Sequence, residues 1–175
     1  VILCNSDFDS DKEKDYLRVL KEKMVDGVIY MSSSLEEETL DIINELDLKT
    51  VLVETKDKEG RLPSVYIDNI EATYEATKHL LDKGIKNIAF IGVDKSSANA
   101  WGDRYIGYEK ALNEAGIPVD EDLVYFEGLK VKSGYVASEK FLASGKNFDG
   151  IICASDEIAM GAINGLREKG VNTPE

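Results

Sequence analysis

Short apolar segments of strand length recur along the chain, and a segment with helical periodicity follows most of them. The apolar segments are almost continuous in valine, isoleucine and leucine. That composition is typical of strands buried on both faces of a parallel sheet. We therefore predict strands at residues 1–4, 27–31, 50–53, 65–67, 88–91, 123–126 and 150–154.

The intervening segments repeat apolar residues every three or four positions, which is the spacing of one helix face. Ser10 and Glu13 have the spacing of a capping box at the first of these helices, and Ser34 and Glu37 repeat it at the second. The expected inward stripes are Tyr16, Leu17, Leu20 and Met24; Leu40, Ile43 and Leu46; Ala72, Ala76 and Leu80; and Tyr105, Tyr108 and Leu112. Strands that alternate with helices predict an α/β fold with parallel sheets and right-handed crossovers.

One interval departs from this alternation. Residues 53–65 are polar, contain no helical pattern and end near Pro63, and a short strand follows at once. Two successive strands without a helix between them suggest that the chain leaves its first sheet here. We therefore place a lobe boundary at Asn69, which divides the chain into an N-terminal lobe of residues 1–69 and a C-terminal lobe of residues 70–175.

The charge balance restricts the partners of this chain. Its net charge is −13, from 34 acidic and 21 basic side chains, so its surface repels nucleic-acid phosphates. Cys4 and Cys153 lie within apolar segments, which predicts buried free thiols in a reducing compartment. No apolar run approaches the roughly 20 residues of a membrane helix, so we expect no membrane association.

Polar residues gather where the predicted strands end. In open parallel sheets, ligands bind beyond the carboxyl ends of the strands. Hydroxyls, amides and carboxylates at those ends suit a polyol or a similar polar ligand. Alternatively, these residues serve only as helix caps; Ser155 is a good N-cap, and Asp156 complements a helix dipole. The polar strand ends are Asn5-Ser6-Asp7, Ser32-Ser33-Ser34, Glu54-Thr55, Asp94-Lys95-Ser96, Glu127 and Ser155-Asp156.

Arg104 and Trp101 are further ligand-binding candidates. Arg104 opens a predicted helix, where the helix dipole disfavours a cation, so a ligand role gains weight over an ion pair with Asp103. Trp101 is the only tryptophan and lies in a predicted polar loop. It could stack against a ligand or pack between lobes.

The patterns of enzymes and metal sites are missing from the sequence. There is no glycine-rich nucleotide loop and no nucleophile with a nearby base, and His79 falls in the middle of a predicted helix. Residues 7–11 imitate the start of a calcium loop, but Lys12 and Arg18 occupy the positions that require Gly and Glu. We therefore predict no catalytic residue, no metal and no cofactor.

Six segments in order along the chain resemble the LacI/GalR family of bacterial repressors, and most closely its catabolite control branch. They are Val25-Asp26-Gly27-Val28-Ile29, Leu62-Pro63-Ser64-Val65-Tyr66-Ile67-Asp68-Asn69, Gly84-Ile85-Lys86-Asn87-Ile88-Ala89-Phe90-Ile91-Gly92, Arg104-x-x-Gly107-Tyr108-x-x-Ala111-Leu112, Ser155-Asp156-Glu157-x-Ala159-x-Gly161-Ala162 and Gly170-Val171-x-x-Pro174.

The resemblance implies a two-lobed fold like that of periplasmic sugar-binding proteins, each lobe a parallel sheet flanked by helices, with an effector in the interlobe cleft. The family's cleft contacts map onto Asp156, Arg104 and Glu54. To these ligand-binding candidates we add Ser6 and Ser32 from the polar strand ends, and Trp101 from its predicted polar loop. The chain is then expected to be truncated at both ends and to lack a DNA-binding helix-turn-helix.

As a family member, the full-length protein would be a cytoplasmic, homodimeric transcription regulator whose effector is a sugar or sugar phosphate. Its catabolite control branch would add the phosphocarrier protein HPr, phosphorylated on a serine, as a partner. An alternative with the same architecture is a periplasmic or lipoprotein sugar-binding component of a transporter. The expected dimer contacts lie on the helix after Asp156, which could instead be buried in its own lobe: Ile158, Ala162, Ile163 and Leu166.

Overall fold

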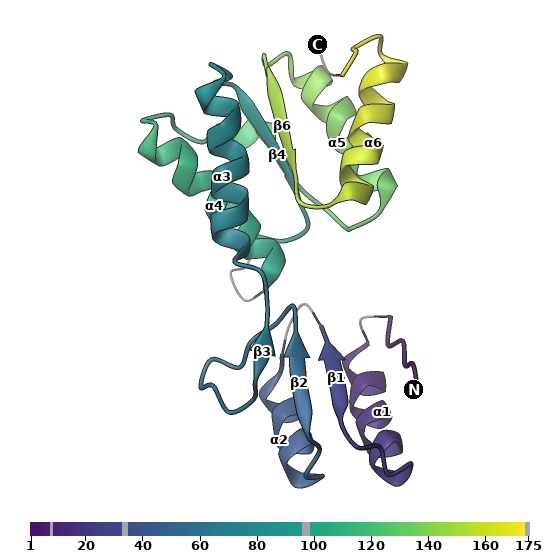
Figure 1. The fold of residues 1–175 in the computed structure, drawn as a ribbon. Coiled ribbons are helices and arrows are strands. Elements are labelled where there is room, and N and C mark those ends of the chain that lie inside the picture. The colour runs from purple at the N-terminus through teal and green to yellow at the C-terminus, as the bar shows by residue number, and fades with distance from the viewer. Residues whose placement is uncertain (8, 33–34, 96–98, 174–175) are drawn as a thin grey trace. The chain divides into compact units, whose positions relative to one another are not determined.

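The computed structural model describes residues 1–7, 9–32, 35–95 and 99–173. The chain forms two compact units, Val1–Ile67 and Asp68–Glu175, and in the described residues each contains a three-stranded parallel sheet (Figure 1). The predicted α/β class with parallel sheets is confirmed. The division falls two residues before the expected boundary, and Asp68 caps helix α3 (Asn69–Asp82) by accepting a hydrogen bond from the Glu71 backbone N–H.

The first unit contains α1 (Ser10–Glu22), β1 (Val28–Met31), α2 (Glu37–Glu45), β2 (Thr50–Val53) and β3 (Ser64–Val65), with sheet order β1-β2-β3. Its core joins Leu17 of α1 and Ile43 of α2 to Leu52 of β2. Side chains that alternate with this buried set are exposed, such as Ile29 at 78% and Val65 at 66%. The expectation of burial on both sheet faces is therefore wrong for this unit.

Residues 1–4 form no strand, contrary to the prediction. A strand needs hydrogen bonds from a neighbour, and among the described residues β1 pairs only with β2. The capping prediction for α1 is also wrong: Asp9, not Ser10, accepts hydrogen bonds from the backbone N–H groups of Asp11 and Lys12. The second predicted cap, Ser34, lies outside the described residues.

The second unit adds to α3 the elements β4 (Ile88–Gly92), α4 (Ala100–Glu114), the 3₁₀ turn η1 (Glu121–Leu123), β5 (Val124–Phe126), α5 (Val131–Ser144), β6 (Gly150–Cys153) and α6 (Asp156–Glu168). The sheet order is β5-β4-β6, and the central strand β4 is buried throughout. Helices α3 and α4 lie on one side of this sheet, and α5 and α6 lie on the other (Figure 1). No helix in the described part of the chain is long and apolar enough to cross a membrane.

The two helix pairs of the second unit touch backbone to backbone at glycines. A Cβ atom on Gly107 of α4 would lie 2.2 Å from the Ile70 carbonyl oxygen of α3. A Cβ on Gly161 of α6 would lie 1.8 Å from the Val131 carbonyl oxygen of α5. Neither position has room for any side chain, so these glycines set the distance between the paired helices.

The glycine contact explains one wrong prediction about α3. Ala72 and Ala76 were expected to face inward, but both are exposed, whereas Thr73 and Thr77 are buried. Small polar side chains fit the close α3–α4 contact, and the Thr77 hydroxyl donates to the Thr73 carbonyl at 2.8 Å within its own helix. The predicted stripe of α4 is confirmed, because Tyr105, Tyr108 and Leu112 are buried.

Three of the four residues expected at a dimer contact are buried within this unit instead. Ile158, Ala162 and Leu166 of α6 are at most 3% exposed, so that part of the prediction is wrong. Ile158 and Ala162 belong to one core cluster with residues of β4 and α5, because α6 must cover its own sheet. Ile163, 39% exposed, remains on the outer face of α6 beside Met160, which is 57% exposed.

The helix-free interval before β3 is organised by a buried carboxylate. Asp57 accepts hydrogen bonds from the Arg61 backbone N–H at 2.6 Å and from its Nε at 2.9 Å. The Arg61 Nη2 also donates to Glu37 of α2 at 3.0 Å. The hydrogen bonds from Arg61 hold the pKa of the Asp57 carboxyl below its usual range. This ion pair therefore ties the loop to α2.

We expect Gly161→Ala to destabilise the protein by about 1–3 kcal/mol, because the added methyl group must push α6 away from α5. Gly128→Ala is the matched control, since the nearest atom to its new Cβ, Ser133 Oγ, would be 3.8 Å away. Urea denaturation followed by circular dichroism measures both. Equal midpoints for the two variants would contradict the close contact.

We expect the Asp57–Arg61 pair to make stability depend on pH in the acid range. Because the folded-state pKa of Asp57 is depressed, its contribution is present above the unfolded pKa of about 4 and is lost as pH falls toward the folded value. The stability difference between wild type and Asp57→Asn should therefore shrink between about pH 5 and pH 3. Asp15→Asn, whose side chain is 76% exposed, is the control. A pH-independent difference for Asp57→Asn would refute the role of its charge.

Candidate functional site

The carboxyl ends of the parallel strands β4, β5 and β6 share one edge of the second unit's sheet. Helix α4 follows β4 and begins at Ala100, where Asn99 caps it by accepting hydrogen bonds from the Trp101 and Gly102 backbone N–H groups. Trp101 therefore lies in the first turn of α4 and not in a loop. Arg104 lies one turn into the helix and does not open it, so both predicted positions are corrected.

Contacts from α3, from α4 and from the end of β6 orient the Arg104 guanidinium. Its Nε donates to the Asn69 side-chain oxygen at 2.8 Å, at the start of α3. Its Nη1 donates to the backbone carbonyl of Ala154, just beyond β6. Its Cζ lies 4.7 Å from the centre of the Trp101 ring. Arg104 is therefore oriented at the edge of the sheet by α3, α4 and the end of β6.

Asp156 begins α6, two residues after the carbonyl that Arg104 contacts. Ser155 accepts a hydrogen bond from the Ile158 N–H at 3.3 Å, which confirms the predicted N-cap. The Asp156 side chain is exposed and accepts from the Glu157 N–H at 3.0 Å. The hydrogen bond from Arg104 to Ala154 thus connects α4 to the segment between β6 and α6, directly before Asp156.

Asn69 is the residue of this site that the sequence reasoning missed. It is 5% exposed and was identified only as a lobe boundary. The sequence carries one usable signal. Asp68 and Asn69 both precede the helical pattern of α3, and because a helix needs only one N-cap residue, the other side chain is available for another contact. No sequence pattern links Asn69 to Arg104, 35 residues later.

In the first unit, Ser6 and Ser32 belong to one polar cluster. Ser6 Oγ donates to Glu13 Oε1 at 3.1 Å, and the Tyr30 hydroxyl donates to the other oxygen of Glu13. Ser32 and Thr39 also hydrogen-bond the Tyr30 hydroxyl. Burial is the main cause that raises the pKa of the Tyr30 hydroxyl, and the hydrogen bond to Glu13 is the second. These contacts give Ser6 and Ser32 a structural role beside α1 and the end of β1.

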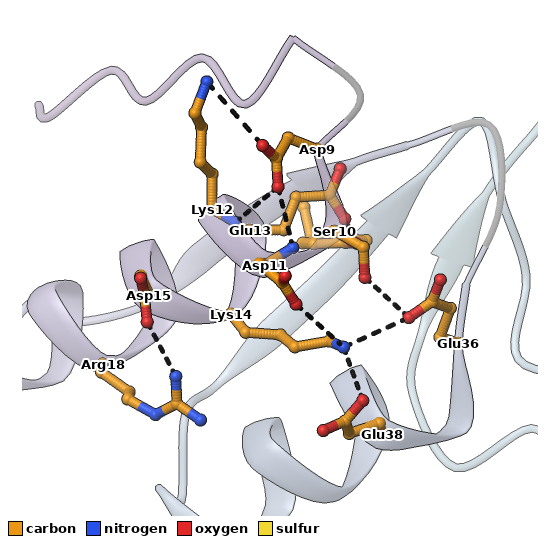
Figure 2. A network of polar contacts seen from close by, with 11 residues as sticks. Asp9, Ser10, Asp11, Lys12, Glu13, Lys14, Asp15, Arg18, Glu36 and Glu38 are labelled. Atoms are coloured by element: carbon orange, nitrogen blue, oxygen red, sulfur yellow. Dashed lines mark hydrogen bonds and ion pairs between the residues drawn. The ribbon is translucent and has the colours of Figure 1, made fainter.

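A second network joins the N-terminal turns of α1 and α2. Figure 2 shows the Lys14 ammonium group facing three carboxylates, with Glu38 at 2.5 Å, Glu36 at 3.4 Å and Asp11 at 3.9 Å. Ser10 also donates to Glu36 at 2.7 Å, which lowers the pKa of that carboxyl. The hydrogen bond to Glu38 raises the pKa of Lys14. The network holds the two helices together.

Glu54 directly follows β2 and has a left-handed conformation, with φ of 65°. Its backbone N–H donates to the Val65 carbonyl at 3.0 Å, so sheet pairing fixes this conformation. For a non-glycine residue such a conformation costs of order 1–3 kcal/mol, and strain of this kind clusters at binding sites. Glu54 thus lies directly beyond the carboxyl end of β2.

The described residues offer polar recognition more readily than covalent chemistry. His79 is exposed on α3, and no group of three or more His, Cys, Asp or Glu side chains among the described residues could hold a metal ion. Cys4 and Cys153 are free thiols that are only partly buried, so the predicted full burial is wrong. The partial burial of Cys153 raises the pKa of its thiol to about 12, which keeps the thiol protonated.

Known proteins resemble this chain along its whole length. It is 65% identical over 175 residues to the HTH-type transcriptional regulator RegA of Clostridium saccharobutylicum, with all of this chain and 53% of that protein covered. Catabolite control protein A of Staphylococcus xylosus is 37% identical over 173 residues, which cover 99% of this chain and 52% of that protein. The chain thus spans about half the length of the curated relatives it matches.

Solved structures show the same fold. The transcription regulator CcpA of Lactococcus lactis matches with a TM-score of 0.84 and 37% identity, over 99% of this chain and 63% of that one. A LacI-family sugar-binding transcriptional regulator from Escherichia coli, complexed with phosphate, matches with a TM-score of 0.85 and 26% identity, over 99% and 63% of the two chains. The model of one family, described as periplasmic binding proteins and sugar binding domain of LacI family, matches residues 1–175. This chain therefore belongs to the family of periplasmic binding proteins and LacI-type sugar-binding domains.

Proposed function

We propose that this chain is the effector-sensing core of a cytoplasmic LacI-type transcription regulator of carbohydrate metabolism, and that it acts by binding and not by catalysis. The observation that carries the proposal is the orientation of Arg104 by Asn69, Ala154 and Trp101 at the carboxyl edge of the sheet. Such an edge is where doubly wound sheets bind ligands. The similarity to RegA and CcpA supports regulation of transcription as the setting.

The chemistry of the site favours a sugar or sugar phosphate. A guanidinium presents planar donors that fit neighbouring hydroxyls or two oxygens of one phosphate. The Asp156 carboxylate accepts hydrogen bonds from sugar hydroxyls. The phosphate in the E. coli relative shows that a member of this family binds that anion. Glu54, held in its strained conformation at the end of β2, is assigned the same role as Asp156 on the first unit.

DNA and protein partners belong to the full-length protein in this proposal. With a net charge of −13, this chain opposes contact with DNA phosphates, so DNA binding is assigned to a helix-turn-helix outside it. The resemblance to the catabolite control branch extends the proposal to serine-phosphorylated HPr as a protein partner. A HPr titration against the full-length protein, with and without the serine phosphate, tests that extension.

We also propose that the full-length protein is a homodimer that uses the outer face of α6. Met160 and Ile163 are exposed apolar side chains one turn apart on that helix. Large exposed apolar residues that neighbour one another commonly mark protein interfaces.

Effector affinity should fall about ten- to a hundredfold in Arg104→Ala and in Asp156→Asn. Each loses a charge-assisted hydrogen bond, worth about 1.5–3 kcal/mol. Calorimetric titration with glucose, glucose 6-phosphate and inorganic phosphate measures the loss and identifies the preferred class. Arg167→Ala is the control, because Arg167 is an exposed arginine in the last turn of α6. Wild-type affinity in both site variants would refute the assignment.

In the full-length protein, Ile163→Glu should convert the dimer to a monomer at micromolar concentration, because dimerisation would then bury an unpaired carboxylate. Sedimentation velocity measures the change. Val19→Glu on α1 serves as the control, since Val19 is similarly exposed at 42%. A dimer that survives Ile163→Glu unchanged would place the interface elsewhere.

A further inference from the structure

We propose that Asn69 is a positioning residue, whose side-chain amide holds the Arg104 guanidinium against the Trp101 ring in the orientation that reads the effector. The proposal rests on the proposed function for its biological meaning. The positioning itself stands on the contacts of the second unit and can be tested without an effector.

The first step is the geometry of the hydrogen bonds. Nε is the guanidinium donor nearest the aliphatic stem, and it donates to Asn69 Oδ1 at 2.8 Å. Nη1 donates to the Ala154 carbonyl. Two hydrogen bonds from different nitrogens of a rigid planar group fix both its plane and its rotation about the stem. The Trp101 ring, 4.7 Å away, supports one face of that plane.

The second step is that helix capping does not account for the Asn69 side chain. Asn69 is the first residue of α3 and directly follows the N-cap position, where asparagine is favoured because its side chain can accept from the helix N–H groups. Here Asp68 performs that function, because its carboxylate accepts from the Glu71 N–H at 3.0 Å. The Asn69 side chain instead contacts Arg104 of α4, and the residue is only 5% exposed. Its side-chain acceptor therefore serves Arg104.

The third step separates positioning from packing. The α3–α4 contact is set by the backbone approach of Gly107 to Ile70 and by the buried Thr73 and Thr77. Loss of the Asn69 amide leaves that contact in place, so it should free the arginine without separating the helices. An arginine that is already oriented loses less conformational entropy when a ligand binds, which raises affinity.

The chain carries its own reporter of this arrangement, because Trp101 is its single tryptophan and lies directly beneath the guanidinium. A cation over an indole ring changes the electrostatic field at the ring. Tryptophan emission of the ligand-free protein therefore reports whether Arg104 is in place. A merely structural role for Asn69 would alter thermal stability and leave this emission unchanged.

The experiment compares the ligand-free emission of the 175-residue chain with that of Asn69→Ala, Asn69→Asp and Arg104→Ala, beside thermal melts. Asn69→Ala should give the emission spectrum of Arg104→Ala, whereas Asn69→Asp, which retains an acceptor for Nε, should keep the wild-type spectrum. Thr73→Ala, a buried α3 residue on the same side of the helix, controls for perturbed packing. A wild-type spectrum in a folded Asn69→Ala protein would overturn the proposal.

Should Asn69→Ala fail to fold, Asn69→Gln replaces it, because the longer side chain keeps the amide but displaces the acceptor from Nε. It should then depart from the spectrum of Asn69→Asp, and identical spectra would overturn the proposal. Titration with glucose 6-phosphate and inorganic phosphate forms the second arm, in which Asn69→Ala should bind about tenfold more weakly than Asn69→Asp. If emission follows the expected pattern but Arg104→Ala binds both probes normally, positioning stands and the proposed function fails.

Discussion

The parallel pairing of β4 with β5 and β6 is the constraint on which the second unit depends. Because the strands run in one direction, every connection must return along a face of the sheet, and every following helix begins near the same edge. Strand β4 is buried along its whole length, so both faces need helices. The glycine contacts at Gly107 and Gly161 let those helices pack in close pairs. The same arrangement brings the start of α3, the first turns of α4 and the end of β6 together around Arg104.

Buried or partly buried charged groups in both units have defined partners. In the first unit, the buried Lys14 and the buried Asp57 each form an ion pair, with Glu38 and Arg61 respectively. A buried charge requires such a partner. These pairs fasten α1 to α2 and the loop to α2. Arg104 in the second unit donates to an amide oxygen and a backbone carbonyl, which orient the guanidinium.

The predicted site residues stay a prediction, but the structure shows which contacts each of them makes. Polar strand ends predicted Ser155 and Asp156 just beyond a strand, and the structure places them at the start of α6. Arg104, predicted at a helix start, lies one turn into α4. Ser6 and Ser32 carry the same polar signal but contribute to the cluster around Glu13 and Tyr30. A hydroxyl after a strand looks the same in sequence whether it meets a ligand or a neighbouring carboxylate. Only the position of that neighbour distinguishes the two.

The sequence by itself determined the alternation of strands and helices, the α/β class, the buried stripe of α4 and the Ser155 cap, because each depends on residues a few positions apart. The tertiary structure decided whatever depends on a neighbour far along the chain. Residues 1–4 are apolar enough for a strand but pair with none in the described residues. The buried face of α3 follows from its contact with Gly107, and Asn69 meets Arg104 across 35 residues because the topology of the sheet brings their helices side by side. Local periodicity carries no information about such pairings, since they arise only when the strands have found their order.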